Sequence, residues 1–410
     1  MALERFFATA PRGLEPLLAD ELTAQGATDC RSVAGGIQFR ADWPTCYRVN
    51  LESRIATRVL WLVADGFYRE EDDIYKIAAK QPWPSLFELE KTFRVVTTAI
   101  RCPLKSLDFV TLRVKDAVCD RFRDLYDKRP NIDTREPEVR VHVFLTEDHC
   151  TLYLDTSGAP LWQRGLRHAN VDAPLKENLA AGILKLSGWQ PDQPLLDPMC
   201  GSGTFLLEAA CMSLDMAPGL HRVKFGFENL STFDAAAWSD IREAALRRQQ
   251  EPRPLPLFGS DIDPHAVRAT KRNLQEAGLG NVVKVQEADL LSLSPPELPL
   301  PVEGKVVDRA GTLVANPPYG ERIGEQDALA KLYPAIGDTL KKRFAGWNSY
   351  FFTADLRMAK LLGLKPSRKT PLFNGALECR LFEIKVIAGS NRKEKPIPAD
   401  PSADLSLKQP

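Results

Sequence analysis

The feature of this sequence that most constrains its fold is an apolar segment that runs directly into an asparagine and two prolines. Residues 312–315 read Thr-Leu-Val-Ala, which is typical of a short buried β-strand. Asn316 follows, and then Pro317 and Pro318, which cannot continue a strand and restrict the residues before them to extended geometry. With Tyr319 next, the pattern predicts an amide and an aromatic ring on a stiff loop at a strand's carboxyl end, where open α/β sheets bind ligands. We interpret this loop as a clamp for a flat ring that carries an amino group.

The size and composition of the chain limit the kinds of protein it can be. A chain of 410 residues predicts two or three domains. Its 54 basic and 54 acidic residues cancel, so any surface that binds nucleic acid must come from local clustering. The eight cysteines show no C-x-x-C spacing, which argues against a zinc site and a disulfide framework. Because the sequence has neither a signal peptide nor a long apolar run, we expect a cytoplasmic protein without a membrane partner. We also expect a monomer without a bound metal.

The first 155 residues predict a mixed α+β region with no catalytic grouping. The expected strands are residues 4–8, 35–39, 56–64, 91–100, 139–145 and 151–154, and the expected helices are residues 11–25, 42–51 and 106–126. The last of these helices has the clearest pattern, because apolar residues recur in it every three or four positions.

The polar face of the helix at residues 106–126 is rich in basic residues. Residues 91–140 contain twelve Lys and Arg against eight Asp and Glu. Such a face is either a solvated surface of mixed charge or a patch that contacts nucleic-acid phosphates, and both interpretations stay open. The basic residues of this face and just beyond it are Arg113, Lys115, Arg121, Arg123, Lys128 and Arg129.

The second half of the chain contains a glycine turn between an expected strand and an expected helix. Asp197 ends a short apolar segment, and Gly201 and Gly203 in the following turn let the backbone approach a ligand closely. The third glycine of a dinucleotide fingerprint is replaced by Leu206, which argues against a dehydrogenase. A carboxylate beside the turn suits a cation, and S-adenosylmethionine carries an ammonium, a sulfonium and no phosphate.

Two further acids follow the next two expected strands. Asp261, after the strand 255–259, is placed to accept hydrogen bonds from ribose hydroxyls. Asp289 follows the strand 282–286 and is placed to accept one from an adenine amino group, with hydrophobic neighbours flanking the ring. Asp263 is instead expected to cap a helix at residues 264–277. The expected cofactor-binding residues are Asp197, Met199, Cys200, Gly201, Gly203, Thr204, Asp261, Ile262, Asp289, Leu290 and Asn316.

The rest of this half predicts a parallel sheet that finishes in an antiparallel hairpin. Asp197 and Asp261 are 64 residues apart, against about 20 in a compact dinucleotide unit, so we expect an insertion at about residues 216–254 on the domain's flank. A helix at residues 326–344 and a strand at 348–354 precede the hairpin, whose turn is Asn374-Gly375.

Taken together, these motifs resemble class I methyltransferases that carry a ferredoxin-like domain and a THUMP domain, an RNA-binding module, at the N-terminus. Besides the glycine turn and the Asn316 loop, the matching segments are residues 112–121, 164–167 (Arg-Gly-Leu-Arg), 173–178 and 374–381. The resemblance implies a Rossmann-like α/β methyltransferase fold preceded by an α+β region. The implied domains are residues 1–65 (ferredoxin-like), 66–155 (THUMP), 156–175 (linker), 176–390 (methyltransferase) and 391–410 (disordered tail).

The nearest family members are bacterial enzymes of the RlmL type, which methylate guanine N2 in 23S ribosomal RNA. In some of them a second methyltransferase domain follows. The resemblance implies S-adenosylmethionine as cofactor and RNA, most of all 23S rRNA or a large-subunit precursor, as partner. It implies that Asn316 and Pro317 accept the amino hydrogens, that Pro318 stiffens the loop and that Tyr319 stacks on the base. It adds Arg164 and Arg167 to the expected RNA-binding residues.

Alternative functions share parts of this pattern. A transfer-RNA guanine-N2 methyltransferase has both halves and is the hardest to separate. DNA adenine-N6 methyltransferases and glutamine methyltransferases acting on release factors use the same loop, but neither has an obvious use for an RNA module. In a non-enzymatic RNA-binding protein we would expect some of the three acids or the residues of the Asn316 loop to be replaced. All of them are present in this sequence.

Overall fold

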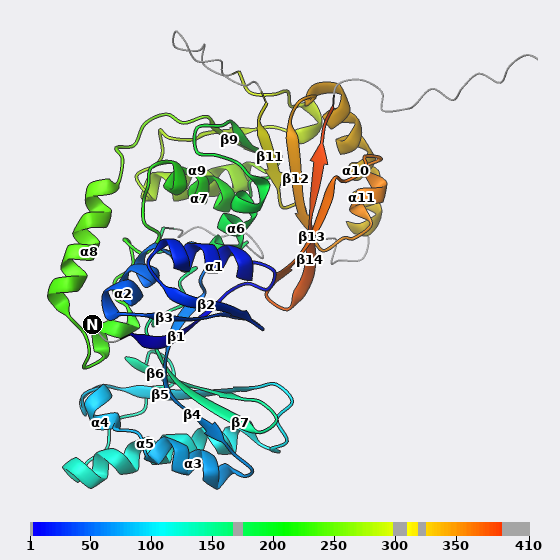
Figure 1. Ribbon diagram of the computed structural model, residues 1–410. Helices are drawn as coiled ribbons and strands as arrows, with labels where there is room; N and C mark the ends of the chain where they lie inside the picture. The colour runs from blue at the N-terminus through cyan, green and yellow to red at the C-terminus, as the bar shows by residue number, and fades with distance from the viewer. Residues whose placement is uncertain (1–2, 167–174, 298–309, 319–324, 388–410) are drawn as a thin grey trace, which may run out of the picture.

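The computed structural model describes residues 3–166, 175–297, 310–318 and 325–387, and it contains two seven-stranded sheets (Figure 1). The first sheet has the strand order β2-β3-β1-β4-β7-β6-β5. Its strands are β1 (Glu4–Thr9), β2 (Thr28–Val33), β3 (Gly36–Ala41), β4 (Arg58–Phe67), β5 (Phe93–Ala99), β6 (Val139–Leu145) and β7 (His149–Asp155). Strand β4 runs across the expected domain boundary at residue 65 and pairs with β1 and β7, so the two expected N-terminal domains share one sheet.

Helices cover one face of this first sheet. They are α1 (Glu15–Ala24), α2 (Trp43–Glu52), α3 (Glu71–Ala79), α4 (Trp83–Leu86) and α5 (Leu107–Tyr126). The Phe6 ring of β1 lies 5.7 Å from the Trp43 ring of α2. At the far end of β4, a Cβ on Gly66 would lie 3.2 Å from Ile77 of α3. The β4 register shifts between Leu62 and Ala64, which keeps the helices of both parts on the same face.

The second sheet has the order β10-β9-β8-β11-β12-β14-β13, in which β8 to β12 are parallel and the last two strands form the expected antiparallel hairpin. Its strands are β8 (Leu195–Asp197), β9 (Leu257–Asp261), β10 (Lys284–Glu287), β11 (Thr312–Ala315), β12 (Asn348–Thr353), β13 (Arg368–Asn374) and β14 (Leu377–Lys385). The helical elements are α6 (Glu177–Ser187), α7 (Thr204–Ser213), η1 (Gly226–Asn229), α8 (Ala235–Arg248), α9 (Pro264–Glu276), η2 (Leu290–Ser292), α10 (Glu325–Arg343) and α11 (Met358–Leu361). Parallel strands place their carboxyl ends at one edge of the sheet, and the candidate site lies there.

Local chemistry explains where several elements begin. Ser106 accepts a hydrogen bond from the Phe109 amide at 3.1 Å and so caps α5 where the sequence predicts a helix start. Helix α1 begins at Glu15 and not at residue 11, because Gly13 has a φ of +96° that belongs to a turn. Strand β2 and helix α3 are absent from the sequence expectations. All but one of the residues of β2 are exposed, so the strand has no apolar alternation to reveal it.

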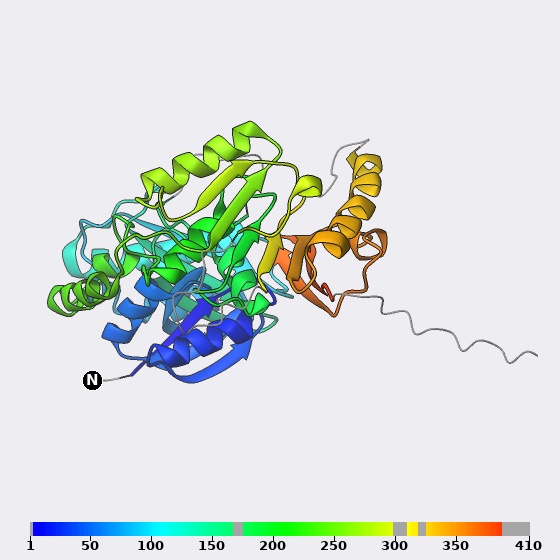
Figure 2. The ribbon, with the colours of Figure 1, turned by 90° about the horizontal axis from the view of Figure 1, so that it is seen from above.

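The insertion at residues 216–254 joins the two halves of the molecule and does not merely lie on the flank of the second sheet. The Phe227 ring lies 4.5 Å from the Tyr47 ring of α2. Backbone amides of Gly219 and Ser231 donate to the carbonyls of Leu51 and Leu86 at 2.8 and 2.9 Å. Figure 2 shows the insertion helix α8 outside both sheets. The part of the chain that the structure describes has no helix long and apolar enough to cross a membrane.

Candidate cofactor and methyl-transfer site

Strand register brings three of the expected site residues to one edge of the second sheet. Asp197 ends β8 and pairs with Gly259 of β9, two residues before Asp261 at the end of that strand. On the other side of β8, Leu196 pairs with Leu313 of β11, three residues before Asn316. The neighbouring strands therefore present two carboxylates and one amide at the same end of the sheet.

Asp197 is the most buried acid of this edge, with 1% of its surface exposed. Burial raises its pKa well above the ordinary value, and the charge of Asp261 raises it further. The Met199 amide donates a hydrogen bond to the Asp197 carboxylate at 3.3 Å, and this bond acts in the opposite direction by lowering the pKa. A carboxylate in such surroundings is stabilised by a cation, so its chemistry fits the ammonium group of S-adenosylmethionine.

The glycine turn after Asp197 is held from two directions. Gly201 and Gly203 have φ values of +55° and +82°, which residues with a side chain rarely adopt. A Cβ on Gly203 would lie 2.8 Å from the Thr270 methyl group of α9, and the Thr270 hydroxyl donates to the Gly201 carbonyl at 2.8 Å. The Asn273 amide donates to the Ser202 carbonyl at 3.0 Å. Thr270 and Asn273 support the turn, and sequence reasoning missed both because nothing separates them from other buried residues of an amphipathic helix.

Asp261 has a structural contact in addition to its expected ribose contact. One carboxylate oxygen accepts from the Gly201 amide at 2.9 Å, and the other accepts from the Asp263 amide at 3.0 Å. Each carboxylate oxygen has two lone pairs, so the group keeps capacity for two hydroxyls. Asp263 caps α9 by accepting from the His265 amide at 2.8 Å, as the sequence predicts.

The residues expected around the adenine ring differ in exposure. Ile262 is 69% exposed beside Asp261, while Leu290 is only 3% exposed because it packs into the second hydrophobic cluster. The placement of both side chains beside the ring stays a prediction. Asp289 accepts a hydrogen bond from the Leu291 amide at 2.9 Å.

The remaining cofactor candidates lie in or next to the glycine turn. Met199 is half-buried, and Cys200 and Thr204 are buried. Burial is the largest cause of the raised pKa of the Cys200 thiol, and the Cys200 amide donates to the Ser260 carbonyl at 3.0 Å. The Cys200 thiol is therefore a neutral packing group.

The Asn316 loop follows a strand whose four residues are all buried. Asn316 is half-buried, Pro317 is buried and Pro318 is exposed, so the loop rises from the core to the surface within three residues. Tyr319 lies outside the described residues. At the end of the adjacent strand β12, Asp355 accepts from the Arg357 guanidinium at 2.9 Å, and this hydrogen bond is the main cause of its lowered pKa. Sequence reasoning did not single out this fifth polar position of the edge.

Comparison with known proteins agrees with this geometry. Residues 164–383 match the family model described as the RMKL-like methyltransferase domain, residues 68–155 match the THUMP domain, and residues 5–60 match the RlmL ferredoxin-like domain. The first of these models covers more than half of the chain.

The chain belongs to the RMKL-like methyltransferase family. A class I methyltransferase fold with ferredoxin-like and THUMP domains is thereby confirmed, and S-adenosylmethionine is the family's cofactor.

Two relatives and one solved structure illustrate the similarity. Ribosomal RNA large subunit methyltransferase K/L of Syntrophotalea carbinolica is 41% identical over 93% of this chain, which spans only 53% of that relative's length. Putative RNA methyltransferase slr0064 of Synechocystis is 37% identical over 93% of this chain and 96% of its own. The crystal structure of SMU.472 complexed with SAH matches 95% of this chain and 100% of its own, with a TM-score of 0.83 at 29% identity.

Four of the eight cations expected to bind RNA lie on α5, and each of the four already has an acidic partner. Arg113 pairs with Asp72 of α3, whereas the other pairs form within α5. These pairs are Lys115 with Asp116 at 2.8 Å, Arg121 with Asp124 at 3.1 Å and Arg123 with Asp120 at 2.9 Å. Lys128 and Arg129 are exposed just beyond the helix, and Arg167 lies outside the described residues.

Arg164 is the one expected RNA-binding residue whose assignment is wrong. It is 2% exposed, and its guanidinium donates to both carboxylate oxygens of Glu208 on α7, at 3.0 and 3.3 Å. It also donates to the Ser53 and Arg54 carbonyls of the first half at 3.4 and 2.9 Å. A guanidinium with all these buried partners joins two domains and cannot reach RNA.

Proposed function

We propose that this protein transfers a methyl group from S-adenosylmethionine to the exocyclic N2 amine of one guanosine in 23S rRNA or a large-subunit precursor. The observation that carries the proposal is the meeting of Asp197, Asp261 and the Asn316 loop at one sheet edge, in a chain that also has a THUMP domain. Relatives named for methylation of large-subunit ribosomal RNA support the choice of RNA. We expect a cytoplasmic monomer.

The cofactor supplies the methyl group, and three acids of this chain hold it. In the proposal, Asp197 binds the ammonium group, Asp261 the ribose hydroxyls and Asp289 the adenine amino group. The buried Asp197 carboxyl fits this part, because the positive ligand offsets the cost of its charge in apolar surroundings.

The Asn316 loop prepares the attacking amine. The lone pair of an exocyclic purine amine is delocalised into the ring, which makes the amine a poor nucleophile. In the proposal, the Asn316 side-chain oxygen and the Pro317 carbonyl accept its two hydrogens, which aims the lone pair and lessens the conjugation. Tyr319 stacks on the base after it leaves its helix. The rate then comes from positioning and not from a strong general base.

The decisive experiment is nucleoside mass spectrometry of rRNA and tRNA from a deletion strain and from a strain that carries Asn316→Ala. We expect both strains to lose one N2-methylguanosine from 23S rRNA. In vitro, Asn316→Ala should lower kcat by roughly 10²-fold or more, as a loss of alignment does.

Other outcomes separate the alternatives. Unchanged rRNA with altered tRNA would identify a transfer-RNA guanine-N2 methyltransferase. Loss of N6-methyladenine from DNA in the deletion strain would identify a DNA enzyme. Unchanged nucleosides in every fraction, together with RNA binding by the wild-type protein, would leave a non-catalytic RNA-binding protein.

A further inference from the structure

One face of the first sheet carries no helix in the described part of the chain. Strand register places Arg31 of β2 opposite Gln38 of β3, and Gln38 opposite Phe7 of β1. Arg40 and Arg5 form the next cross-strand pair on this same face. The neighbours in between, such as Phe6, point to the opposite face, where the helices pack. We call the uncovered side the open face.

The open face continues through the THUMP strands. Beyond the register shift of β4, Leu62 pairs with Tyr153 of β7, and Tyr153 pairs with His142 of β6. His142 pairs in turn with Val96 of β5, and the pair of Arg140 with Arg94 lies on the same side of these two strands. The open face thus spans all seven strands and both N-terminal domains.

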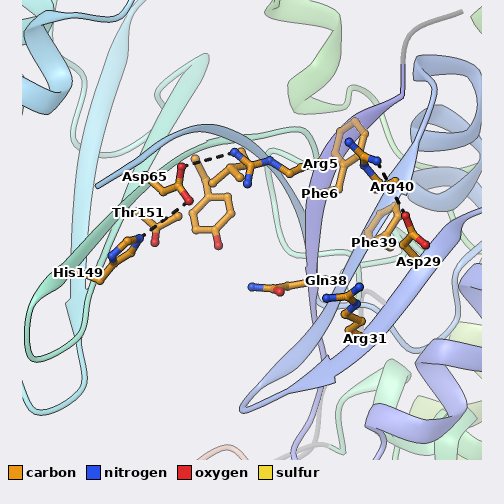
Figure 3. Close-up of a pocket in the computed structure, with 12 residues that line it drawn as sticks. Arg5, Phe6, Asp29, Arg31, Gln38, Phe39, Arg40, Asp65, His149 and Thr151 are labelled. Carbon is orange, nitrogen blue, oxygen red and sulfur yellow. Dashed lines mark hydrogen bonds and ion pairs between the residues drawn. The ribbon is translucent and has the colours of Figure 1, made fainter. Parts of the chain in front are cut away.

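The open face is hollowed where the two domains meet (Figure 3). The hollow has a volume of about 440 Å³. Arg5, Arg31 and Arg40 line it from β1, β2 and β3, and Asp65, His149 and Tyr153 line it from β4 and β7. The hollow is open to solvent, since the side chains of Arg5 and Arg40 are 58% and 51% exposed.

Positive charge exceeds negative charge on the open face. Three of its arginines have acidic partners: Arg5 pairs with Asp65 at 3.4 Å, Arg40 contacts Asp29 at 4.0 Å, and Arg58 of β4 pairs with the buried Asp155. The other three, Arg31, Arg94 and Arg140, have no ion pair within the described residues. Helix α5 differs, because each of its four cations has an acid beside it. An anionic nucleic-acid chain therefore gains more electrostatic attraction from the open face than from helix α5.

Aromatic rings lie on the open face among these arginines. Phe7 of β1 and Tyr153 of β7 lie 6.1 Å apart across the sheet. Phe67 at the end of β4 is 76% exposed, and the His149 ring that lines the hollow meets it edge-on at 4.9 Å. Tyr153 is buried and Phe7 is half-buried, so Phe67 is the ring of this group that is open to a ligand. An exposed ring beside arginines suits single-stranded nucleic acid, whose bases stack on the ring while its phosphates contact the cations.

We propose that the open face binds a single-stranded segment of the substrate RNA, with Arg31 and Arg40 on phosphates and Phe67 stacked on a base. The inference rests on the proposed function for the identity of the nucleic acid, and it assigns the contact to this face and not to α5. A duplex hides the faces of its bases and is read by its shape, so it cannot use the rings.

The test is the fluorescence anisotropy of a labelled single-stranded RNA of about 12 nucleotides, titrated with the full chain at several salt concentrations. Arg31→Glu/Arg40→Glu should weaken binding tenfold or more, and it should lower the salt slope by about 1.4, since each lost contact on a single strand removes about 0.7. The control Arg121→Glu/Arg123→Glu reverses two charges on α5 and should stay within about twofold of wild type. Calorimetry with S-adenosylmethionine shows whether each variant is folded.

Phe67→Ala tests stacking separately from charge. It should weaken binding of the single strand about tenfold with an unchanged salt slope, because no charge is removed. Equal binding of the single strand and its duplex, or loss of affinity in the α5 variant alone, would overturn the inference. Methyl transfer by the wild-type protein is measured apart from these titrations, so failure of the proposed function is seen independently.

Discussion

Asp197 is the residue whose surroundings say most about the ligand. Its carboxyl is almost completely buried, has one backbone donor, and lies near a second acid at the next strand end. Burial and like charge both raise its pKa, so a ligand that Asp197 binds in its ionised form must offset the cost of that ionisation. In the proposed function, protonation and cofactor binding are therefore linked at this residue.

The first prediction follows from the direction of that pKa shift. In the free protein Asp197 holds its proton to a higher pH than an ordinary aspartate, and the bound cation lowers its pKa again. Between these two pKa values, binding of S-adenosylmethionine should release a proton, and affinity should rise with pH until it levels off above the higher value. Titration calorimetry in two buffers of different ionisation enthalpy measures the released proton.

Asp197→Asn and Asp263→Asn form the matched pair for this measurement. The first should abolish the proton release and weaken binding. The second replaces an exposed helix cap by another good cap and should leave both unchanged. Proton release that persists in Asp197→Asn would assign the linkage to another group.

At the scale of elements, the junction between the two sheets depends on a buried ionic cluster. Glu208 on α7 contacts Arg164 of the connector and, at 3.7 Å, Arg54 of the first half. Helix α7 begins directly after the glycine turn, so this cluster connects that turn to the N-terminal half. The exposed side-chain fractions of Arg164 and Glu208 are 2% and 4%, so solvent screens the pair little.

The second prediction concerns this cluster. Arg164→Met should lower the free energy of unfolding by about 3–5 kcal/mol, because it leaves Glu208 charged and buried with only the longer contact to Arg54. Urea unfolding followed by circular dichroism measures the change. The control Arg247→Met removes an exposed pair with Glu243 on α8 and should cost less than about 1 kcal/mol. Similar losses in the two variants would contradict a special role of the buried cluster.

Sequence predicted the elements that carry a strong local pattern. Helix α5 was found because its apolar residues repeat at helical spacing, and the hairpin of β13 and β14 because Asn374-Gly375 is a turn signal. Strand β2 was missed, since it lies at a sheet edge with almost every side chain exposed. Its place is set by pairing with β3, which is a tertiary interaction.

In the candidate site, too, the sequence did not reveal the residues whose roles depend on tertiary packing. Asp197, Asp261 and Asn316 were predicted together because each follows a recognisable strand, and parallel strands align their ends. Thr270 and Arg164 could not be assigned in this way. The role of Thr270 depends on how α9 packs on the turn, and Arg164 looks like a surface cation until the fold buries it.

At the scale of the whole molecule, the two sheets are joined at several places far apart in sequence. Asn178 of α6 donates to the Ile55 carbonyl and the Thr57 hydroxyl at 3.2 and 3.0 Å. The insertion adds an aromatic cluster around Tyr47, whose ring faces Phe227 and Trp238. Figure 1 shows the consequence: the helices α1 and α2 of the first half lie between its sheet and the methyltransferase domain. These contacts fix the spacing between the N-terminal half and the Asn316 edge of the second sheet.

The third prediction tests whether the joined halves unfold as one body. Tyr47 is fully buried; its hydroxyl donates to the Thr232 carbonyl at 3.2 Å and accepts from the Asp234 amide at 3.0 Å. Tyr47→Phe keeps the ring and should cost about 1–3 kcal/mol, because it leaves both backbone groups of the insertion without this partner. We expect one cooperative urea transition, shifted to lower concentration, with the same midpoint by tryptophan fluorescence and by circular dichroism.

Tyr126→Phe is the matched control, since Tyr126 is 46% exposed and its loss of a hydroxyl should change the free energy of unfolding by less than about 0.5 kcal/mol. Two separate transitions in wild type, or a shift in Tyr47→Phe confined to one of them, would show that the halves unfold independently. In that case the insertion only lies against α2 and does not fix the spacing between the N-terminal half and the Asn316 loop. A single shifted transition shows that the contacts between Tyr47 and the insertion stabilise both sheets together, as a fixed spacing between them requires.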